Sequence, residues 1–387
     1  FVLIYAAMGL GRSQESGAWE AWFDNNYRVA MPHDKDRKMY GVMLGRMGML
    51  FQIVSTVVLL PGAWLALLYG RTWVFTIQTV ASLILVIVII ATMKDFPEAE
   101  AIRKEQRIQS GGYFQILRDG FEFLWSHPFI TFFIIGDVII FATGTLWWQL
   151  LLFPLYFSYL ITDVAVAAYR TINFVPLVVA QERGGIWSKR FDPKTWIPRF
   201  KLLQGIGFVF FILLALNLLI FPAPTGVVEI AALYFPFTNV PIIEMPLVSV
   251  IPMVILLVIF TLTDFFAAFA NILTQRVMID VIPNRIRNSM YSLKPTLAII
   301  VAIPLIWFFG GFVPLYGLAA TFILVAMIAL LGSTLIYKGF SYQIPKAADL
   351  ERFVIREQGD DSLIEIIDEN DETINVSEYD GKEGSNY

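Results

Sequence analysis

Long apolar runs separated by short polar stretches dominate the chain. A helix needs about 20 mainly apolar residues to cross a bilayer. Barrel strands would alternate in short segments, whereas these runs are continuous. The pattern therefore predicts an all-α polytopic membrane protein with nine transmembrane helices, the first interrupted by charges: Phe1–Phe23, Gly41–Tyr69, Thr72–Met93, Pro128–Tyr156, Thr162–Gln181, Leu202–Phe221, Leu247–Asn271, Tyr291–Phe312 and Leu315–Tyr337.

Basic residues concentrate in every second polar stretch. The intervening stretches are nearly free of Lys and Arg, apart from Arg71. By the positive-inside rule the basic stretches are cytoplasmic, which places residue 1 outside and the carboxyl end inside. We therefore expect an integral protein of the plasma membrane with a cytoplasmic C-terminus. The basic stretches are Arg28–Lys38, Lys94–Arg118, Arg183–Lys201 and Arg276–Lys294.

Composition agrees with lipid as the main solvent. The chain of 387 residues is 57% hydrophobic and 16% charged, and its mean hydropathy is +0.66. Soluble domains are about 45–50% apolar and about 25% charged. The net charge is −4, and eleven acids lie in the tail from Glu357 onward. Because the chain has no cysteine, disulfides and thiolate metal sites are excluded.

The spans and polar stretches divide the chain into four parts. Residues 1–93 hold three predicted transmembrane helices, and residues 94–127 form a long polar cytoplasmic loop. Residues 128–340 hold six predicted helices, and residues 341–387 form an acidic cytoplasmic tail. The outer stretch between the sixth and seventh spans is apolar and Pro-rich, and we expect a loop there with a re-entrant or interfacial piece.

Three local motifs resemble the major facilitator superfamily of transporters. GLGRSQESGAWEAWFDN resembles the family's fourth helix. ERGGIWSKRFDPK is similar to the family's cytoplasmic loop pattern, which Gly185, Ser188, Arg190 and Lys194 match, whereas Lys189 stands where that pattern has an acid. QRVMIDVIPNRIRNSMYSLKPT resembles the connection between the tenth and eleventh helices.

This resemblance implies a two-bundle fold of twelve helices, six in each bundle, joined by a long cytoplasmic loop. The nine predicted spans correspond to helices 4–12, so we expect three further helices upstream of Phe1. The second span lacks a clean Gly-x-x-x-Gly-Pro-x-x-Gly-Gly, the signature associated with antiporters. Symport and antiport therefore both remain open.

Several polar side chains fall inside the predicted spans. An ionisable group at the bilayer centre costs about 2.5–3.5 kcal/mol on insertion scales, so each needs a partner, a cavity or an interface. The alternative to a role in transport is a neutralised pair or a hydrogen bond that only packs helices. The candidates for substrate binding or ion coupling are Arg12, Glu15, Asp137, Arg170, Asp264, Gln149 and Asn173.

A second set of residues lies at the predicted cytoplasmic ends of the spans. Glu20 and Asp24 are four residues apart on one helix face, with Arg28 next on that face. The alternative is that these are interface charges paired with loops, and that the basic residues only enforce topology. The resemblance implies a cytoplasmic gate, for which the candidates are Glu20, Asp24, Gly185, Arg190, Lys194, Arg285 and Arg287.

Motifs for other chemistries are missing from the sequence. It contains no P-loop, no HExxH and no G-x-S-x-G, so we expect no enzyme, no catalytic residues, no metal site and no cofactor. The prediction is a monomeric secondary transporter that moves a small solute by alternating access, coupled to protons and inclined to efflux. Its partners would be the solute, protons and the bilayer, with no nucleic acid. The alternatives are a membrane-embedded enzyme, or a non-transporting sensor or scaffold that signals through the acidic tail.

Overall fold

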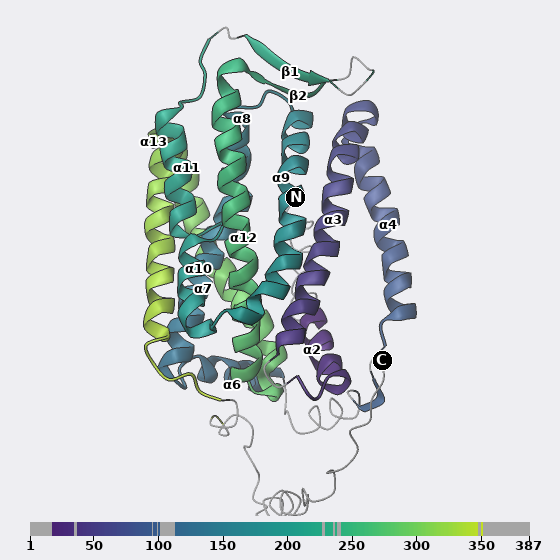
Figure 1. Ribbon diagram of the computed structural model, residues 1–387, viewed down its shortest axis with the longest axis vertical. Helices are drawn as coiled ribbons and strands as arrows, with labels where there is room; N and C mark the ends of the chain where they lie inside the picture. Colours follow the sequence, from purple (N-terminus) through teal and green to yellow (C-terminus); the bar gives the residue numbers. More distant parts are fainter. Residues whose placement is uncertain are drawn as a thin grey trace, which may run out of the picture.

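The helices stand side by side in one elongated bundle (Figure 1). The structure, a computed structural model, describes residues 18–34, 37–94, 96–98, 100, 113–226, 229–234, 237, 241–346 and 350. A two-stranded ribbon lies at one end of the bundle, here called the ribbon end, and the short helices α2 and α6 lie at the other, the basic end.

The elements alternate between long helices and short connecting pieces. In chain order they are α2 (Ala18–Ala30), α3 (Lys38–Tyr69), α4 (Arg71–Thr92), α6 (Tyr113–Leu124), α7 (Pro128–Leu146), a π-helical turn (Trp147–Leu151), α8 (Leu152–Phe157), α9 (Asp163–Trp187), a 3₁₀ turn (Ser188–Arg190), α10 (Pro193–Leu203), α11 (Phe208–Ile220), β1 (Ile230–Tyr234), β2 (Pro241–Pro246), a 3₁₀ turn (Leu247–Ser249), α12 (Val250–Val281) and α13 (Asn284–Gly339).

Within the described residues, seven helical segments are long and apolar enough to cross a membrane. The protein is therefore an α-helical membrane protein. The first predicted span lies mostly outside the described residues, so the count of nine stays a prediction. The seven segments are Lys38–Tyr69, Arg71–Thr92, Pro128–Phe157, Asp163–Arg190, Pro193–Ile220, Leu247–Val281 and Ser289–Gly339.

The last segment consists of two helices that meet at Gly317. The backbone there has φ 78° and ψ 171°, which is not helical and which glycine adopts without steric cost. Phe309 and Phe322, one on each side of Gly317, belong to one buried cluster, and Ile286 and Ile336 belong to another. The two halves of α13 therefore run antiparallel, as the separate eighth and ninth predicted spans require.

The sixth predicted span differs from the expectation. It was expected as one helix from Leu202 to Phe221 after a loop that ends at Lys201. Instead α10 already begins at Pro193, because the Asp192 side chain caps it by accepting a hydrogen bond from the Thr195 N–H (3.1 Å).

The same span is interrupted between α10 and α11. The helix breaks at 204–207, where Ile206 has φ 82°. A tertiary contact holds this break, because the Gly205 N–H donates to the Thr263 carbonyl (2.9 Å) on α12. The break therefore depends on the neighbouring helix as well as on the local sequence.

The apolar, Pro-rich outer stretch, expected as a loop with a re-entrant or interfacial piece, contains a two-stranded β-ribbon. β1 and β2 pair antiparallel, with Ile230 opposite Pro246 and Leu233 opposite Ile243. Ile230 and Tyr234 of β1 and the two isoleucines of β2 are residue types enriched in strands. Pro241 stands at the first position of β2, where a strand tolerates proline. Periodicity alone did not separate this short apolar run from a loop.

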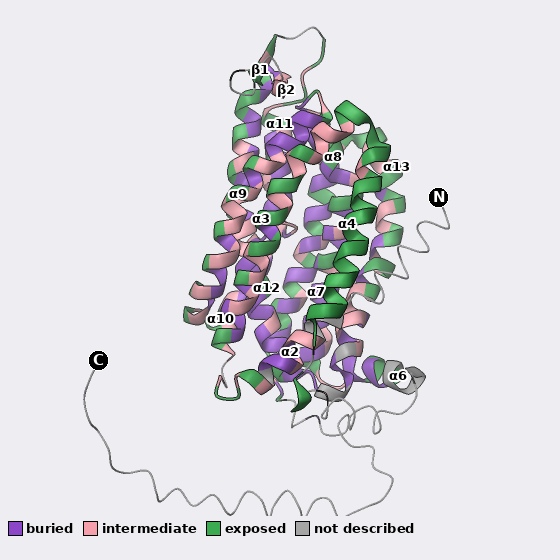
Figure 2. Cartoon of the chain, turned by 90° about the vertical axis from the view of Figure 1, so that its right-hand side faces the viewer, coloured by how far each residue is buried: buried purple, intermediate pink, exposed green. Residues whose placement is uncertain are grey.

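Burial divides the helices into two groups. The C-terminal group, α7 to α13, holds two buried clusters, one toward each end of the bundle. The N-terminal group consists of α2, α3 and α4. No residue of α4 is buried, and Figure 2 shows it exposed along its length while α7 is largely buried. α3 packs along α9 and so joins the two groups.

Candidate functional site

At the basic end, a buried ion pair joins the N-terminal group to the C-terminal group. Asp24 of α2 accepts a hydrogen bond from Nη1 of Arg287 near the start of α13. Their side chains are 0% and 3% exposed, so this charge pair is almost fully removed from solvent. Arg287 also donates through Nη2 to the carbonyls of Ile279 (3.2 Å) and Ile282 (3.0 Å) at the end of α12. The Arg287 guanidinium therefore connects the middle of α2 and the end of α12 to the start of α13.

Further contacts surround this ion pair. Tyr27, Tyr40 and Ile279 form a small buried cluster between α2, α3 and α12. The Nε of Arg37 lies 3.9 Å from a carboxylate oxygen of Asp280. On the C-terminal side, Nη1 of the buried Arg276 donates to the Ser188 carbonyl (3.1 Å). We call Asp24, Arg287 and these neighbouring contacts the basic-end latch.

The connection between α2 and α3 is fixed by a second acid, Asp34. Its carboxylate accepts hydrogen bonds from the Tyr27 hydroxyl (2.5 Å) and from the N–H groups of Lys38 (3.1 Å), Met39 (2.9 Å) and Tyr40 (3.2 Å). Burial opposes ionisation, but these hydrogen bonds favour the carboxylate more strongly, so the pKa of Asp34 is lowered. Burial and the neighbouring Asp34 raise the pKa of Tyr27, which keeps its hydroxyl protonated as the donor.

Glycines bring α3 and α9 into backbone contact near the latch. A Cβ on Gly185 would lie 2.8 Å from the Gly41 carbonyl oxygen, and one on Gly45 would lie 2.7 Å from the Gln181 carbonyl oxygen. Gly185 was predicted as a gate residue from the loop motif, and its place in this contact gives that motif a packing role.

The other predicted gate residues do not join the latch in what the structure describes. Arg190 and Lys194 are exposed and take part in no ion pair among the described residues. The side chains of Glu20 and Arg285 lie outside what the structure describes.

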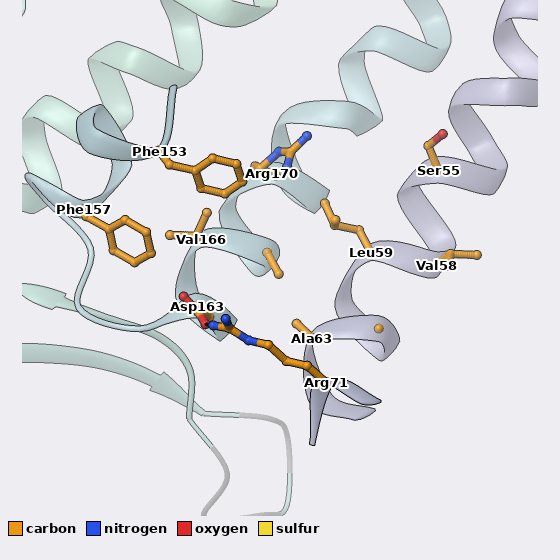
Figure 3. Close-up of a pocket in the computed structure, with 12 residues that line it drawn as sticks. Ser55, Val58, Leu59, Ala63, Arg71, Phe153, Phe157, Asp163, Val166 and Arg170 are labelled. Atoms are coloured by element: carbon orange, nitrogen blue, oxygen red, sulfur yellow. Dashed lines mark hydrogen bonds and ion pairs between the residues drawn. The ribbon is translucent and has the colours of Figure 1, made fainter. Parts of the chain in front are cut away.

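Toward the ribbon end, α3 and α9 separate around a pocket of about 620 Å³. Ser55 contributes one hydroxyl to its lining. An exposed ion pair between Arg71 and Asp163 (3.0 Å) links the starts of α4 and α9 at one edge of the pocket. In Figure 3, Arg170 lies on the other side of the pocket, between Phe153 and Leu59. The remaining wall is apolar and consists of Val58, Leu59, Gly62 and Ala63 from α3, Phe153 and Phe157 from α8, and Val166 and Ala167 from α9.

Arg170 is the charged residue of the pocket that lies away from the Arg71–Asp163 ion pair. Its guanidinium carbon lies 5.7 Å, 6.0 Å and 5.4 Å from the ring centroids of Trp148, Phe153 and Phe174. Its Nε is buried without a hydrogen-bond partner, and among the described residues no acid pairs with it. Arg170 is thus a cation in an apolar, aromatic setting.

The two predicted amide candidates lie near Arg170 but differ in burial. Asn173, one helical turn further along α9, is buried, and its Oδ1 has no hydrogen-bond partner among the described residues. Gln149 lies in the π-helical turn before α8 and is exposed. Neither lines the pocket.

Asp137 belongs to a separate buried ion cluster inside the C-terminal group. Its Oδ1 accepts from Nζ of Lys201 on α10 (2.7 Å), and its Oδ2 pairs with Nζ of Lys294 on α13. The carboxylate is 5% exposed and Lys201 is 4% exposed. Neither lysine was predicted as a site residue, because both were placed in loops. The signal was available, since an acid within a span needs a partner, a cavity or an interface, and a lysine at the end of another span can supply the partner.

Asp264 lies beside the break between α10 and α11. A Cβ on Gly205 would approach its Oδ1 to 3.1 Å, and the neighbouring Thr263 carbonyl accepts from the Gly205 N–H. Among the described residues Asp264 has no ion-pair partner. Arg12 and Glu15, the remaining coupling candidates, lie outside the described residues.

Comparison with known proteins does not assign the chain to a family. The described residues include no group of three or more His, Cys, Asp or Glu that could hold a metal ion. The fold is that of an α-helical membrane protein with a latch at one end and a pocket toward the other. No protein-family model, curated protein or solved structure matches the chain.

Proposed function

We propose that the protein is a secondary active transporter that moves a small solute by alternating access between its two groups of helices. One observation carries this proposal. The same two groups are joined by a buried latch at the basic end and separated by the pocket toward the ribbon end. In alternating access, the site opens to one side while the opposite side is closed.

The local motifs support a transporter of the major facilitator type, and the basic stretches support a cytoplasmic basic end; we place the protein in the plasma membrane. In that arrangement the latch would close the protein toward the cytoplasm. Asp24 and Arg287 would form the cytoplasmic gate, and Gly185 would bring α3 and α9 together beneath it.

Proton coupling is the simplest energy source for this transporter. Asp264 is the best-placed described acid, because it lies within a span and is not neutralised by a cation among the described residues. Asp137 is less suited, because Lys201 and Lys294 already compensate its charge. Glu15 remains a candidate from the sequence.

The motion can be tested without knowing the solute. Since the chain has no cysteine, cysteine pairs for spin labels can be introduced directly into the intact protein. Pro32 with Lys194 reports on the basic end, and Leu68 with Ile172 on the ribbon end; all four residues are exposed. Alternating access with proton coupling predicts opposite changes in the two distances when pH is varied. Two distances that stay fixed under every condition would contradict it.

Coupling needs a separate measurement. Proteoliposomes containing the intact protein should accumulate solute when a pH gradient is imposed, and Asp264→Asn should abolish gradient-driven accumulation. Glu15→Gln tests the other candidate in the same assay. Flux that ignores the gradient in the wild type, and survives both substitutions, rules out proton coupling.

A further inference from the structure

We infer that the pocket between α3 and α9 binds an amphipathic organic anion, whose acidic group pairs with Arg170 and whose apolar body lies against Phe153, Phe157 and the α3 wall. This assigns a substrate class to the proposed transporter and so rests on that function. The shared chemistry is a carboxylate, phosphate or sulfonate carried on an apolar body, whether from a free solute or from an anionic lipid.

The pocket carries an uncompensated positive charge. Its lining contains two guanidinium groups, Arg71 and Arg170, and one carboxylate, Asp163. Asp163 is already paired with Arg71 at 3.0 Å. Arg170 therefore leaves the described lining with one excess positive charge, and arginine does not lose its proton in proteins.

Arg170 also retains unused hydrogen-bonding capacity. Three aromatic rings surround its guanidinium at 5.4 to 6.0 Å. Rings attract the cation through their π faces, but they do not satisfy the N–H donors in the guanidinium plane. The Nε is buried, but the side chain as a whole is partly exposed, and among the described residues neither terminal nitrogen, Nη1 or Nη2, donates a hydrogen bond. These two nitrogens are the donors that a ligand in the pocket would meet. A planar fork of donors matches the two oxygens of a carboxylate or phosphate.

The shape and polarity of the remaining wall indicate an apolar body on the ligand. Apart from Ser55 and the charged groups, the side chains that line the pocket are aliphatic or aromatic. The volume of about 620 Å³ lies within the range of about 300–1,000 Å³ typical of sites for drug-sized ligands. A small inorganic anion would leave most of this wall uncovered, whereas a body of one or two rings would cover it.

Probes that share a naphthalene ring and differ in charge test this inference. Naphthalene-2-carboxylate, naphthalene-2-sulfonate and 2-naphthyl phosphate are the anions, 2-naphthylmethanol is neutral and 2-naphthylmethylamine is a cation. Binding to the intact protein in non-ionic detergent is measured by calorimetry against micelles alone. We expect at least one anion to bind saturably, and about tenfold or more tightly than the neutral probe, as a charge-assisted hydrogen bond implies.

Variants of two arginines locate the binding. Arg170→Gln should weaken the anion about tenfold or more and leave the neutral probe unchanged. Arg170→Lys keeps the positive charge but loses the planar set of guanidinium donors, so this variant should bind the anion with intermediate affinity. It replaces Arg170→Gln in the test if that variant does not fold. Arg199→Gln is the matched control, because Arg199 also lies over a ring, that of Trp196 at 5.2 Å, but does not line the pocket.

Competition with lipids identifies the source of the anion. Phosphatidylglycerol that displaces the bound probe, where phosphatidylcholine does not, would identify an anionic lipid; failure of both to displace it would favour a free solute. Equal binding of the neutral and anionic probes, no binding of any anion, or unchanged affinity in both Arg170 variants would overturn the inference. If the two spin-label distances still change oppositely in that case, the transporter proposal stands and only its substrate class is wrong.

Discussion

Asp24 is a fully buried carboxylate, and Arg287 supplies the opposite charge that it needs. Removing one partner of a buried pair leaves the other charge uncompensated, which typically costs about 3–5 kcal/mol. We expect Asp24→Asn and Arg287→Gln each to lower the unfolding temperature strongly in detergent. The double variant should lose less than the sum of the two, because neither charge is then left alone.

An exposed ion pair provides the control for this prediction. Arg118 and Glu122 are one helical turn apart on α6, with Nε and Oε1 2.7 Å apart and side chains 65% and 41% exposed. Such a surface pair contributes about 0.5 kcal/mol or less. Glu122→Gln should therefore barely change the unfolding temperature. If the loss of stability in the double variant equalled the sum of the losses in Asp24→Asn and Arg287→Gln, the two side chains would not be energetically coupled.

Asp34 makes the stability of the basic end depend on pH. Its pKa is lowered in the folded protein, so its stabilising contribution is fully present above the unfolded-state pKa of about 4 and is lost as pH falls through the folded pKa. We expect Asp34→Asn to destabilise the protein near neutral pH, and its difference from the wild type to shrink in acid. Unfolding temperatures measured from neutral pH down to about pH 3 check this. If the difference in unfolding temperature between the wild type and Asp34→Asn did not change with pH, the ionised Asp34 carboxylate would not be the source of the stabilisation.

Among the elements, α3 and α9 make a close backbone contact that is possible only because glycine has no side chain. A methyl group on Gly45 would lie 2.7 Å from the Gln181 carbonyl oxygen and 2.9 Å from Gly185 Cα. Gly45→Ala should force the helices apart and cost roughly 1–3 kcal/mol, the usual range for overpacking. On the same helix, Gly62→Ala would meet nothing within 4 Å. Thermal unfolding should therefore shift in opposite directions in the two variants, since alanine favours a helix. A Gly45→Ala protein as stable as the wild type would contradict this contact.

The elements also show how much of the fold the hydrophobic pattern of the sequence predicts. Most described spans begin and end within a few residues of the predicted limits, because lipid requires long apolar helices. The break at 204–207 was not predicted, since the hydrogen bond from Gly205 to Thr263 joins two segments far apart in the chain. The ribbon was missed because the pairing of two segments, not the periodicity of either, makes it a sheet.

For the whole molecule, orientation follows from the basic stretches. If they are cytoplasmic, the ribbon end faces outward. In intact cells, a membrane-impermeant maleimide should label Phe237→Cys, whose side chain is fully exposed near the ribbon. It should label Trp125→Cys, beside α6, only after the membrane is permeabilised. The cysteine-free wild type is the blank, and the reverse labelling pattern would invert the topology.

Local composition was enough to establish lipid as the solvent, the helical class and the polar residues that need an explanation. It was enough because burying charge in lipid is costly wherever the charge occurs. Which charges meet became clear only in the folded molecule, where Asp24 pairs with Arg287, Asp137 gains two lysines expected in loops, and Arg170 faces a pocket. Such pairings depend on packing between segments far apart in the chain, and no local pattern of residues encodes the distance between them.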